Sequence, residues 1–434
     1  MKIGVIGTGY VGLALACLAD FDNEVLFVGR SADKISNLKR GILPIYEKGL
    51  DEIVKRNLER NRIDATTDYE RLKDAEMIFI CVGTPSLPDG SIDLSQIRTA
   101  SESLGTLIKG INDYKTIVVK STVVPGTTKN IVIPALEKTS GKKTGAGFGV
   151  CMNPEFLREG TAVYDFLYPD KVVIGGYDEK SSSTVSKLYV FYGNKVPTIT
   201  TDLNTAEMIK YAQNAALASR ISFINEIANI CEKFEVDVYE VAKTIGLDSR
   251  IGPKFLNAGA GFGGSCFPKD VKALLATAKS VGTNPILLDA ILEVNKYQPH
   301  RMVDLAKQVL GNLRGQKIAI LGLAFKSDTD DMREASSIQI INSLLMENAT
   351  VKVYDPQAIG SAKKIFGNSV EYCSSKEECI NDADLCMIVT EWDEFKQISL
   401  SEIRCPIIDG RRVLNPLLVK QHGIVYKGIG WKNN

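Results

Sequence analysis

The chain has 434 residues, and 52 Lys and Arg balance 52 Asp and Glu, so its formal net charge is zero. This length favours two or three domains, and without a basic excess the chain is not expected to bind nucleic acid. No apolar run is long enough to span a membrane. Residues 1–12 are predicted to form a strand and a phosphate-binding turn, which leaves no room for an export signal. We therefore expect a cytoplasmic protein.

The cysteines are widely scattered along the chain. There are nine cysteines and two histidines, with no CxxC pair, so the spacing typical of zinc ligands is missing and no metal site is expected. Most cysteines lie in apolar runs, as Cys81 does in MIFICVG, and are interpreted as small buried hydrophobes. Because histidine is so scarce, catalysis is expected to depend on Cys, Lys, Asp or Glu.

Residues 1–200 alternate short apolar strands with helical stretches. The expected strands are KIGVIG, EVLFVG, EMIFICVG, TIVVKSTV and FGVCMNP. Such alternation predicts a parallel sheet with helices on both faces. We interpret this segment as a Rossmann-like NAD(P)-binding domain.

The pattern becomes helical from Asn204 to Phe234, without Gly or Pro. At roughly 1.5 Å per residue, a helix over this segment is long enough to bridge two domains. Shorter helices are expected up to about Lys296. Residues 201–300 are therefore predicted to form a central all-α domain, whose long helix serves either as a dimer surface or as an internal strut.

Strand–helix alternation returns from Gln316. KIAILG at Lys317 repeats KIGVIG at Lys2, an internal echo that indicates two related halves. The second half, residues 314–434, lacks GxGxxG and is not expected to bind a second dinucleotide. The predicted fold class is thus α/β, with two Rossmann-like doubly wound parallel-sheet domains joined by a central all-α domain with a long helix.

A dinucleotide fingerprint, GxGxxG, occupies residues 7–12 between the first strand and a helix, which is the context that the motif requires. Its glycines permit a tight turn and a close approach of the backbone to pyrophosphate at a helix N-terminus. The acidic residue that usually binds the adenine ribose at the end of the second strand is missing, because Gly29, Arg30 and Ser31 stand there. We therefore predict NAD as the cofactor and expect that NADP is accepted as well, with Arg30 and Ser31 binding its 2′-phosphate.

The densest chemical stretch, GFGGSCFPKD, spans residues 261–270. Pro268 is favoured at a helix start, so Cys266 is expected just before a helix N-terminus, where the dipole and Lys269 favour the thiolate. Asp270 would lie in the first turn, where it could cap the helix or orient water. A structural cysteine at a Gly-rich turn is the competing interpretation.

Lys210 and Asn214 are four residues apart and hence lie on one face of the expected long helix. In that position they could hold an oxyanion and a hydroxyl group. From spacing alone, a solvated lysine beside an amide is the favoured interpretation.

Eight motifs, in order along the chain, carry a resemblance to a known family. They are KIGVIGTGYVG, FICVGTP, KSTVVPGTT, NPEFLREGTAVYDFLYPDKVVIGG, EMIKYAQNAALASRISFINE, RIGPKFLNAGAGFGGSCFPKD, GLAFKSDTDDMRE and DGRRVL. With these motifs the chain resembles the UDP-glucose/GDP-mannose dehydrogenase family over essentially its whole length. The resemblance implies a four-electron oxidation of the sixth carbon of the sugar, through a thiohemiacetal and a thioester on a cysteine, without release of the aldehyde. The motif around that cysteine is closer to the branch that converts UDP-glucose to UDP-glucuronate.

The resemblance also implies roles for individual residues. The implied catalytic residues are Cys266 as nucleophile, Lys210 on the oxyanion, Asp270 orienting lysine and water, Asn214 near the sugar, and Thr122 and Glu155 in water-mediated acid–base work. To the fingerprint residues Gly7, Gly9, Tyr10 and Gly12 and to Arg30, the resemblance adds as cofactor-binding residues Val11, Lys34, Thr84, Thr122, Glu159, Lys269 and Arg333. The implied substrate-binding residues are Glu155, Phe156, Leu157, Lys210, Asn214, Arg250, Phe255, Leu256, Asn257, Gly259, Gly263, Lys326 and Arg411. Lys326 and Arg411 would meet the diphosphate, and Arg250 would reach the substrate of a neighbouring subunit in a homodimer.

Three alternatives remain open. The substrate could be another nucleotide sugar, GDP-mannose or UDP-N-acetylmannosamine, although Ser265 stands where the N-acetylhexosamine branch more typically has His. A two-electron 3-hydroxyacid dehydrogenase would share the plan but would not need Cys266. A noncatalytic nucleotide-sugar-binding protein would not require Cys266, Lys210 and Asp270 together.

Overall fold

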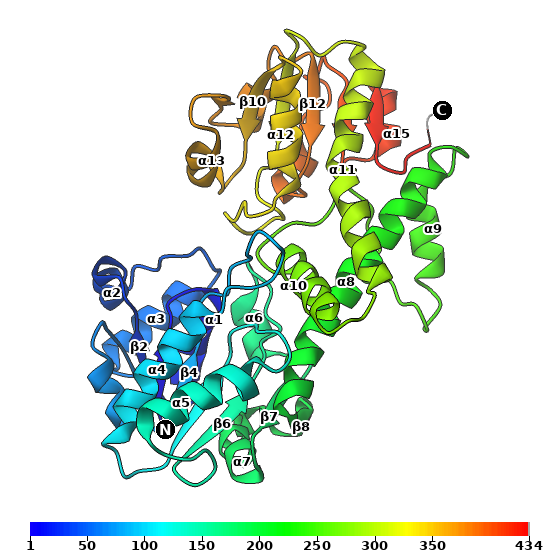
Figure 1. Cartoon of the computed structure of the whole chain (residues 1–434). Helices are drawn as coiled ribbons and strands as arrows, with labels where there is room; N and C mark the ends of the chain where they lie inside the picture. Colours follow the sequence, from blue (N-terminus) through cyan, green and yellow to red (C-terminus); the bar gives the residue numbers. More distant parts are fainter. Residues whose placement is uncertain (433–434) are drawn as a thin grey trace. The chain divides into compact units, whose positions relative to one another are not determined.

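The computed structural model describes residues 1–432 and divides into two compact units, Met1–Gln213 and a second unit that begins at Asn214. Each unit contains one mainly or wholly parallel sheet, and a long helix lies in the middle of the chain (Figure 1). This arrangement confirms the predicted α/β fold class. In residues 1–432, no helix combines the length and the apolar character needed to cross a bilayer.

The first unit is built on an eight-stranded sheet with the order β3-β2-β1-β4-β5-β6-β7-β8. Its strands are β1 (Lys2–Ile6), β2 (Glu24–Val28), β3 (Ile63–Thr66), β4 (Met77–Ile80), β5 (Lys115–Val119), β6 (Phe148–Met152), β7 (Val172–Gly176) and β8 (Thr198–Asp202). All neighbours pair in parallel except β6 and β7, which are antiparallel. The strand order reverses between β1 and β4, and ligands bind at such a switch point in open α/β sheets.

Helices cover both faces of this sheet (Figure 1). They are α1 (Tyr10–Ala14), α2 (Ala32–Lys39), α3 (Leu50–Glu59), α4 (Ser95–Lys109), α5 (Ile133–Ser140), α6 (Ala162–Leu167) and α7 (Glu179–Leu188). Successive side chains of β1 alternate between the two resulting cores, with Ile3 and Val5 in one and Ile6 in the other. A strand buried on both faces explains why the sequence runs are continuously apolar.

Helix α8 (Leu203–Cys231) has 29 residues, or roughly 43 Å of length, and continues from the first unit into the second. The sequence predicts this helix to Phe234. It ends at Cys231 because a turn follows, in which Glu235 adopts φ 56° and Val236 N–H donates to the Cys231 carbonyl at 3.0 Å. Glu235 departs from helical geometry without any Gly or Pro to mark the break, so composition did not reveal it.

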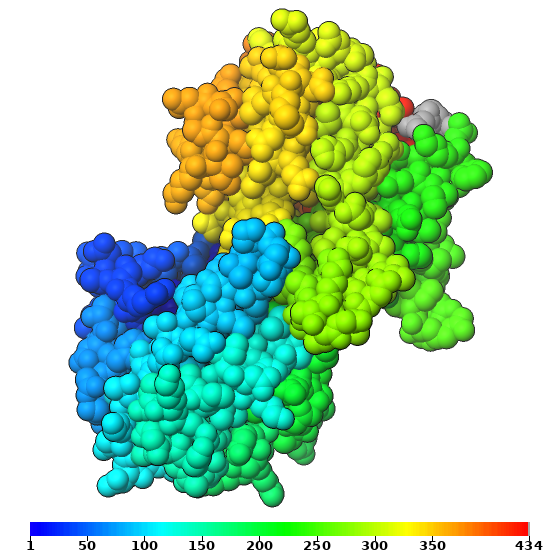
Figure 2. Space-filling model, in the orientation of Figure 1, coloured from blue at the N-terminus to red at the C-terminus, as the bar shows by residue number. Residues whose placement is uncertain are grey.

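Three further helices precede the second sheet: α9 (Val238–Ile245), α10 (Phe267–Ser280) and α11 (Ile286–Leu310). Helix α11 continues well past Lys296, where the helical region was expected to end. Pro299 lies inside α11 and removes one backbone donor, yet the helix persists to Leu310. One side of α11 is open to solvent on the surface of the second unit (yellow-green in Figure 2).

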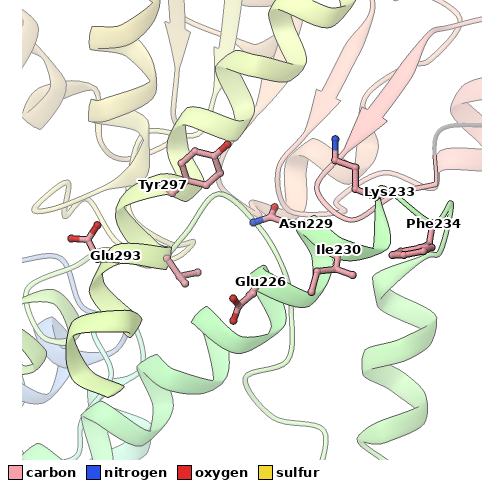
Figure 3. A pocket seen from close by; sticks show the side chains of 8 residues that line it. Glu226, Asn229, Ile230, Lys233, Phe234, Glu293 and Tyr297 are labelled. Carbon is pink, nitrogen blue, oxygen red and sulfur yellow. The ribbon is translucent and has the colours of Figure 1, made fainter. Parts of the chain in front are cut away.

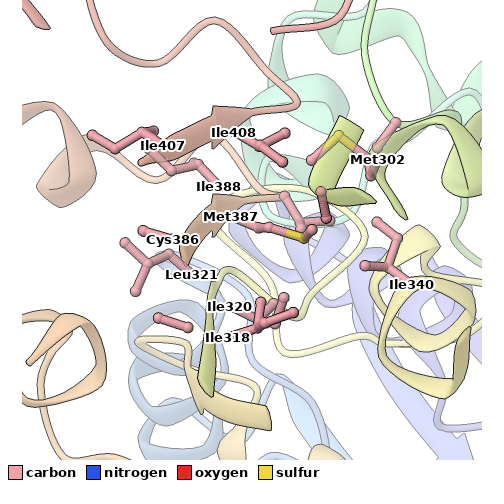
Figure 4. Close-up of a cluster of buried hydrophobic side chains, with 14 of the residues drawn as sticks. Met302, Ile318, Ile320, Leu321, Ile340, Cys386, Met387, Ile388, Ile407 and Ile408 are labelled. Atoms are coloured by element: carbon pink, nitrogen blue, oxygen red, sulfur yellow. The ribbon is translucent and has the colours of Figure 1, made fainter. Parts of the chain in front are cut away.

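The second sheet has six strands, all parallel, in the order β11-β10-β9-β12-β13-β14. The strands are β9 (Lys317–Leu321), β10 (Thr350–Tyr354), β11 (Glu371–Tyr372), β12 (Leu385–Ile388), β13 (Ile407–Asp409) and β14 (Tyr426–Gly428), and the helices are α12 (Ser336–Met346), α13 (Ile359–Phe366), α14 (Lys376–Ile380) and α15 (Pro416–Gln421). Strand β9 takes the position that β1 has in the first sheet, so the internal echo reflects a repeated topology. Figure 4 shows side chains of β9, β12 and β13 packed with Met302 of α11 and Ile340 of α12.

Candidate active site

The GxGxxG turn of the first unit connects β1 to α1, and each of its glycines meets a different surrounding. A Cβ on Gly7, whose φ is +117°, would lie 2.3 Å from the Cys81 carbonyl oxygen, and a Cβ on Gly12 would lie 2.2 Å from the Gly7 carbonyl oxygen. A Cβ on Gly9 would meet no atom within 4 Å. The first and third glycines are therefore required by the protein's own packing, whereas the space beside Gly9 is open, as a pyrophosphate site requires.

The other predicted cofactor residues of the first unit lie around this turn. Tyr10 and Val11 form the first turn of α1. Thr84, after β4, donates its hydroxyl hydrogen to the Thr122 carbonyl oxygen, after β5, at 2.9 Å. The strands that precede these threonines, β4 and β5, are adjacent and parallel. The hydrogen bond therefore joins the segments that follow the carboxyl ends of β4 and β5, beside the switch point. Glu159 is half-buried in the segment after β6.

A buried ion pair joins Lys210 of α8 to Glu155, which follows β6. The Lys210 Nζ to Glu155 Oε1 distance is 3.0 Å, and the two side chains are 4% and 5% exposed. The interpretation of Lys210 as a solvated lysine, favoured from spacing alone, is therefore wrong. Glu155 also accepts a bond from Leu157 N–H at 2.6 Å, and Lys210 Nζ lies 5.5 Å from the centre of the Phe156 ring. The structure thus brings together four residues predicted to act in catalysis or substrate binding.

A second buried lysine of the first unit was not predicted from the sequence. Lys120, directly after β5, donates to Asn153 Oδ1 at 3.0 Å, and the Tyr189 hydroxyl donates to the same oxygen at 2.6 Å. Burial lowers the pKa of Lys120 to about 8. The sequence did contain a signal for this burial, because Lys120 ends the apolar run TIVVK. The residue that follows a strand buried on both faces also tends to lie in the interior.

Glu207 was also missed, one turn before Lys210 on α8. Its carboxylate accepts the N–H groups of Gly126 at 2.6 Å and Thr128 at 2.8 Å, and so ties α8 to the loop after β5 that contains Thr122. Burial raises the pKa of Glu207 to about 7, against the opposing effect of these hydrogen bonds. The hydrogen-bond partners of Glu207 lie some 80 residues away in the sequence, so the local sequence pattern around Glu207 does not predict them.

In the second unit, Cys266 occupies the N-cap position of α10, as the sequence predicts. It is half-buried, whereas the other eight cysteines are buried, and none of the nine forms a disulfide within the part of the chain that the structure describes. The Gly-rich segment before it is closely packed, since a Cβ on Gly263 would lie 2.3 Å from the Glu334 carbonyl oxygen. The Cys266 sulfur lies 3.5 Å from the Ser265 hydroxyl oxygen.

Asp270 lies one turn into α10 and is 1% exposed. Its Oδ2 accepts a bond from Asn214 Nδ2 at 2.6 Å, its Oδ1 pairs with Lys269 Nζ at 2.5 Å, and its own N–H donates to the Cys266 carbonyl oxygen at 2.8 Å. Asp270 therefore serves to hold two predicted site residues beside the helix start that carries Cys266.

The loop from Ile251 to Phe255 is shaped by an arginine that the sequence did not single out. Arg220 of α8 donates to the carbonyl oxygens of Ile251, Gly252 and Lys254 at 2.9, 2.7 and 2.9 Å. Phe255 then adopts φ 63°, a conformation that costs free energy for a residue with a side chain. The fixed loop explains how a predicted substrate residue is held in such a conformation.

The following residues continue the same segment. Leu256 is buried and Asn257 is exposed. Gly259 N–H donates to Asn225 Oδ1 at 2.8 Å, and a Cβ on Gly259 would lie 2.6 Å from the Gly410 carbonyl oxygen. Gly259 is thus fixed by the protein's own packing.

The cationic residues of the second unit differ in their surroundings. Arg411, after β13, donates to the carbonyl oxygens of Val389 at 3.0 Å and Gly261 at 2.9 Å, which anchors its guanidinium next to the Gly-rich segment. Lys326 lies in the loop after β9, half-buried. Arg333 is paired with Asp331 at 2.6 Å, and its side chain is 58% exposed.

Arg250 lies in the segment between α9 and α10. Its side chain is 87% exposed and pairs with the adjacent Asp248 at 2.6 Å. In the first unit, Arg30 and Lys34 are likewise exposed, at the start of α2.

One hollow in the second unit lies away from these residues. It has a volume of about 570 Å³ and is lined by residues of α8, the turn after it and α11, among them Ile230, Phe234 and Tyr297 (Figure 3). None of the predicted catalytic, cofactor or substrate residues lines it.

Comparison with known proteins covers the whole length of the chain. Models of the UDP-glucose/GDP-mannose dehydrogenase family match its NAD binding domain at residues 1–192, its central domain at 204–297 and its UDP binding domain at 319–416. UDP-glucose 6-dehydrogenase AglM of Haloferax volcanii is 43% identical, covering 99% of this chain and 100% of that protein. UDP-glucose 6-dehydrogenase TuaD of Bacillus subtilis is 44% identical, covering 99% and 93%.

Solved structures agree with this assignment. A UDP-glucose dehydrogenase from Pyrobaculum islandicum superposes with a TM-score of 0.92 at 36% identity, covering 99% of this chain and 98% of that one. A UDP-D-ManNAc dehydrogenase from Pyrococcus horikoshii gives 0.89 at 28% identity over the whole of both chains. With its GxGxxG turn, its cysteine at the start of α10 and these matches, the chain belongs to the UDP-glucose/GDP-mannose dehydrogenase family and is an NAD-binding oxidoreductase.

Proposed function

We propose that the chain oxidises UDP-glucose to UDP-glucuronate, with two hydrides passing to NAD and with Cys266 as the covalent catalyst. The observation that carries this proposal is the surroundings of Cys266, a half-buried thiol at a helix start beside a buried carboxylate that holds Asn214 and Lys269. A cysteine kept only for packing would need none of these polar neighbours. The choice of UDP-glucose rests on relatives that bear this activity in their names at 43% and 44% identity.

The role of Cys266 follows from the chemistry of the second oxidation. The first step takes a hydride and a proton from the alcohol carbon and its hydroxyl, leaving an aldehyde. An aldehyde must become tetrahedral before it can lose another hydride, and a thiolate adds to its carbon to form a thiohemiacetal. Loss of the second hydride from the carbon and of the hydroxyl proton leaves a thioester, and water then releases the carboxylate and the thiol. Each hydride would pass to a separate NAD, so the first NADH would be exchanged for a second NAD between the two oxidations.

Two further groups support these steps. The Lys210 ammonium, held by Glu155, supplies positive charge for an oxygen on which negative charge develops. Asp270 keeps Asn214 and Lys269 oriented, with the Asn214 amide directed by its bond to the carboxylate. The exposed positions of Lys34 and Asn257 and the anchored Arg411 fit binding of the cofactor and the nucleotide sugar.

The test compares Cys266→Ala with Cys231→Ala, a matched control at a buried cysteine near the end of α8. We expect Cys266→Ala to form no UDP-glucuronate, while Cys231→Ala retains turnover. The assay uses UDP-glucose, GDP-mannose and UDP-N-acetylmannosamine in parallel and identifies products by mass. Glucuronate formation by Cys266→Ala would refute the covalent role, and turnover of another sugar in preference to UDP-glucose would move the chain to a different branch.

We also propose that NADP is accepted beside NAD, because Gly29 replaces the usual acid directly after β2 and Arg30 follows it. The ratio of kcat/KM for the two cofactors measures this directly. A preference for NAD of several orders of magnitude would rule it out.

A homodimer and a cytoplasmic location complete the proposal. The second unit exposes Phe223, Ile230 and Phe234 on and just after the C-terminal part of α8, with Phe234 75% exposed, and a second copy would bury such a surface. Light scattering of the pure protein tests the dimer, which a monomeric mass would contradict. Fractionation of the producing cells tests the location.

Three domains, residues 1–200, 201–300 and 314–434, are our proposed division. The matched ranges of the three family models support similar borders, although the compact units meet at Gln213 and Asn214. Limited proteolysis tests this division through the fragments that persist.

A further inference from the structure

The end of β2 lies beside the phosphate-binding turn. Ile6 of β1 is the register partner of Val28 of β2, and Gly7 N–H donates to the Val28 carbonyl oxygen at 2.9 Å. Residue 29 therefore occupies the place where dinucleotide-binding domains present an acid to the adenine ribose hydroxyls. In this chain that residue is Gly29.

The backbone conformation at residue 29 does not require glycine, because the φ of Gly29 lies outside the left-handed region. A Cβ at this position would lie 3.1 Å from Ile35 Cδ1 and 3.3 Å from Thr8 Cγ2, so a larger side chain would fit tightly. What Gly29 removes is a negative charge that would repel a phosphate on the ribose. The neighbouring side chains then decide which ribose is favoured.

Arg30 supplies a positive charge at this position. Its Nη2 donates to Gln96 Oε1 of α4 at 3.1 Å, which ties the guanidinium to the start of that helix. That bond uses one of five N–H donors, and the side chain is exposed. A planar guanidinium matches a phosphate group well, since two of its N–H groups can bind two oxygens at once.

Ser31 and Lys34 complete the local charge pattern. Ser31 Oγ accepts a bond from Lys34 N–H at 3.3 Å and caps α2, while its hydroxyl hydrogen is able to donate. Asp33 is the acid in the first turn of α2. Arg30 and Lys34 outweigh Asp33, so the local formal charge is positive.

We infer that Arg30 and Ser31, with Gly29 as the permissive residue, form a subsite for the 2′-phosphate of NADP. This inference deepens the proposed use of NADP by naming the residues that read the phosphate, and it concerns binding alone. A charge-assisted bidentate contact changes affinity by about tenfold or more. We therefore expect 2′,5′-ADP to bind the full-length protein at least about tenfold more tightly than 5′-AMP.

The experiment measures Kd by calorimetry for 2′,5′-ADP, 5′-AMP and inorganic phosphate. The variants are Arg30→Gln and Arg40→Gln, a matched control at the end of α2 whose guanidinium bonds to Asn37. Under the inference, the Kd ratio of 5′-AMP to 2′,5′-ADP falls to about one in Arg30→Gln and is retained in Arg40→Gln. A third variant, Gly29→Asp, should bind 5′-AMP more tightly than 2′,5′-ADP, which inverts this Kd ratio.

Three results would overturn the subsite: equal binding of the two nucleotides by the unaltered protein, a ratio that survives Arg30→Gln, or inorganic phosphate binding as tightly as 2′,5′-ADP. The failure of the proposed NADP use is separate. If 2′,5′-ADP binds in an Arg30-dependent way but NADP supports no turnover, the subsite stands and NADP use fails. If NADP supports turnover but the Kd ratio of 5′-AMP to 2′,5′-ADP is unchanged in Arg30→Gln, NADP use stands and the subsite fails.

Discussion

The pair of Lys210 and Glu155 shows how much a single residue's surroundings decide its role. Both side chains are nearly inaccessible to water, and their charged atoms are 3.0 Å apart. A buried charge that loses its partner is costly, whereas removal of both charges is often tolerated. The effects of this pair on stability and on catalysis can therefore be separated.

Lys210→Met leaves Glu155 as an uncompensated buried carboxylate. We expect the free energy of unfolding to fall by about 3 kcal/mol and turnover to be lost. The double variant Lys210→Met, Glu155→Gln should regain most of that stability, measured by urea unfolding, but no activity. Recovery of turnover in the double variant would show that Lys210 acts through folding alone.

Residue roles that depend on distant partners were hidden from the sequence. Cys266, Asp270 and the GxGxxG glycines lie in dense local motifs, so their position on a helix start or a tight turn could be predicted. Lys120, Glu207 and Arg220 act through groups about 30 to 80 residues away, and nothing near them in the chain marks those partners.

At the scale of elements, the turn between β1 and α1 gives a sharp contrast between two glycines. Gly12 packs against the Gly7 carbonyl oxygen, whereas Gly9 faces open space. We therefore expect the first to be required for folding of the turn and the second for access of a ligand.

Gly12→Ala is expected to lower the melting temperature of the protein without ligand and to abolish NAD binding. Gly9→Ala should leave the melting temperature nearly unchanged and weaken NAD binding at least about tenfold, because a methyl group would occupy the place of the pyrophosphate. Differential scanning fluorimetry with and without NAD measures both. Equal NAD affinity in Gly9→Ala would mean that the pyrophosphate lies elsewhere.

Glu207 links two elements, α8 and the loop after β5, and predicts a pH dependence. Burial raises the pKa of Glu207 from its ordinary value of 4.5 to about 7, so between these values the folded state holds a proton that the unfolded state has released. The stability that Glu207 contributes is therefore full below pH 4.5 and is lost as the pH rises through 7. The slope is about 1.4 kcal/mol per pH unit.

The measurement compares urea unfolding of the protein with that of Glu207→Gln from pH 5 to 7.5. The stability difference between the two should shift in favour of Glu207→Gln as the pH rises. A difference that is independent of pH would show that the carboxylate stays ionised throughout, stabilised by its bonds to Gly126 and Thr128.

The element pattern was predictable where local rules decide it. Alternating apolar runs predicted both sheets, and the absence of Gly and Pro predicted α8. The antiparallel pairing of β6 with β7 and the extension of α11 through Pro299 were not predictable, because tertiary packing decides them. The end of α8 at Cys231 was missed because the turn at Glu235 contains no Gly or Pro.

At the scale of the whole molecule, the six strands of the second sheet repeat the order of the first six strands of the first sheet, yet the two sheets bind different ligands. The first has the glycine turn at its switch point, and the second does not. The family models assign NAD binding to the first and UDP binding to the second. The two domains therefore share a topology but differ in the loops that bind their ligands. For this reason the fold alone does not identify the reaction.

The central claim is an oxidation of four electrons at one carbon through Cys266. The most direct measurement counts the NADH formed per UDP-glucose consumed at the end point, with NAD in excess. We expect two NADH per sugar, with UDP-glucuronate as the product. One NADH per sugar, with the aldehyde released, would contradict it.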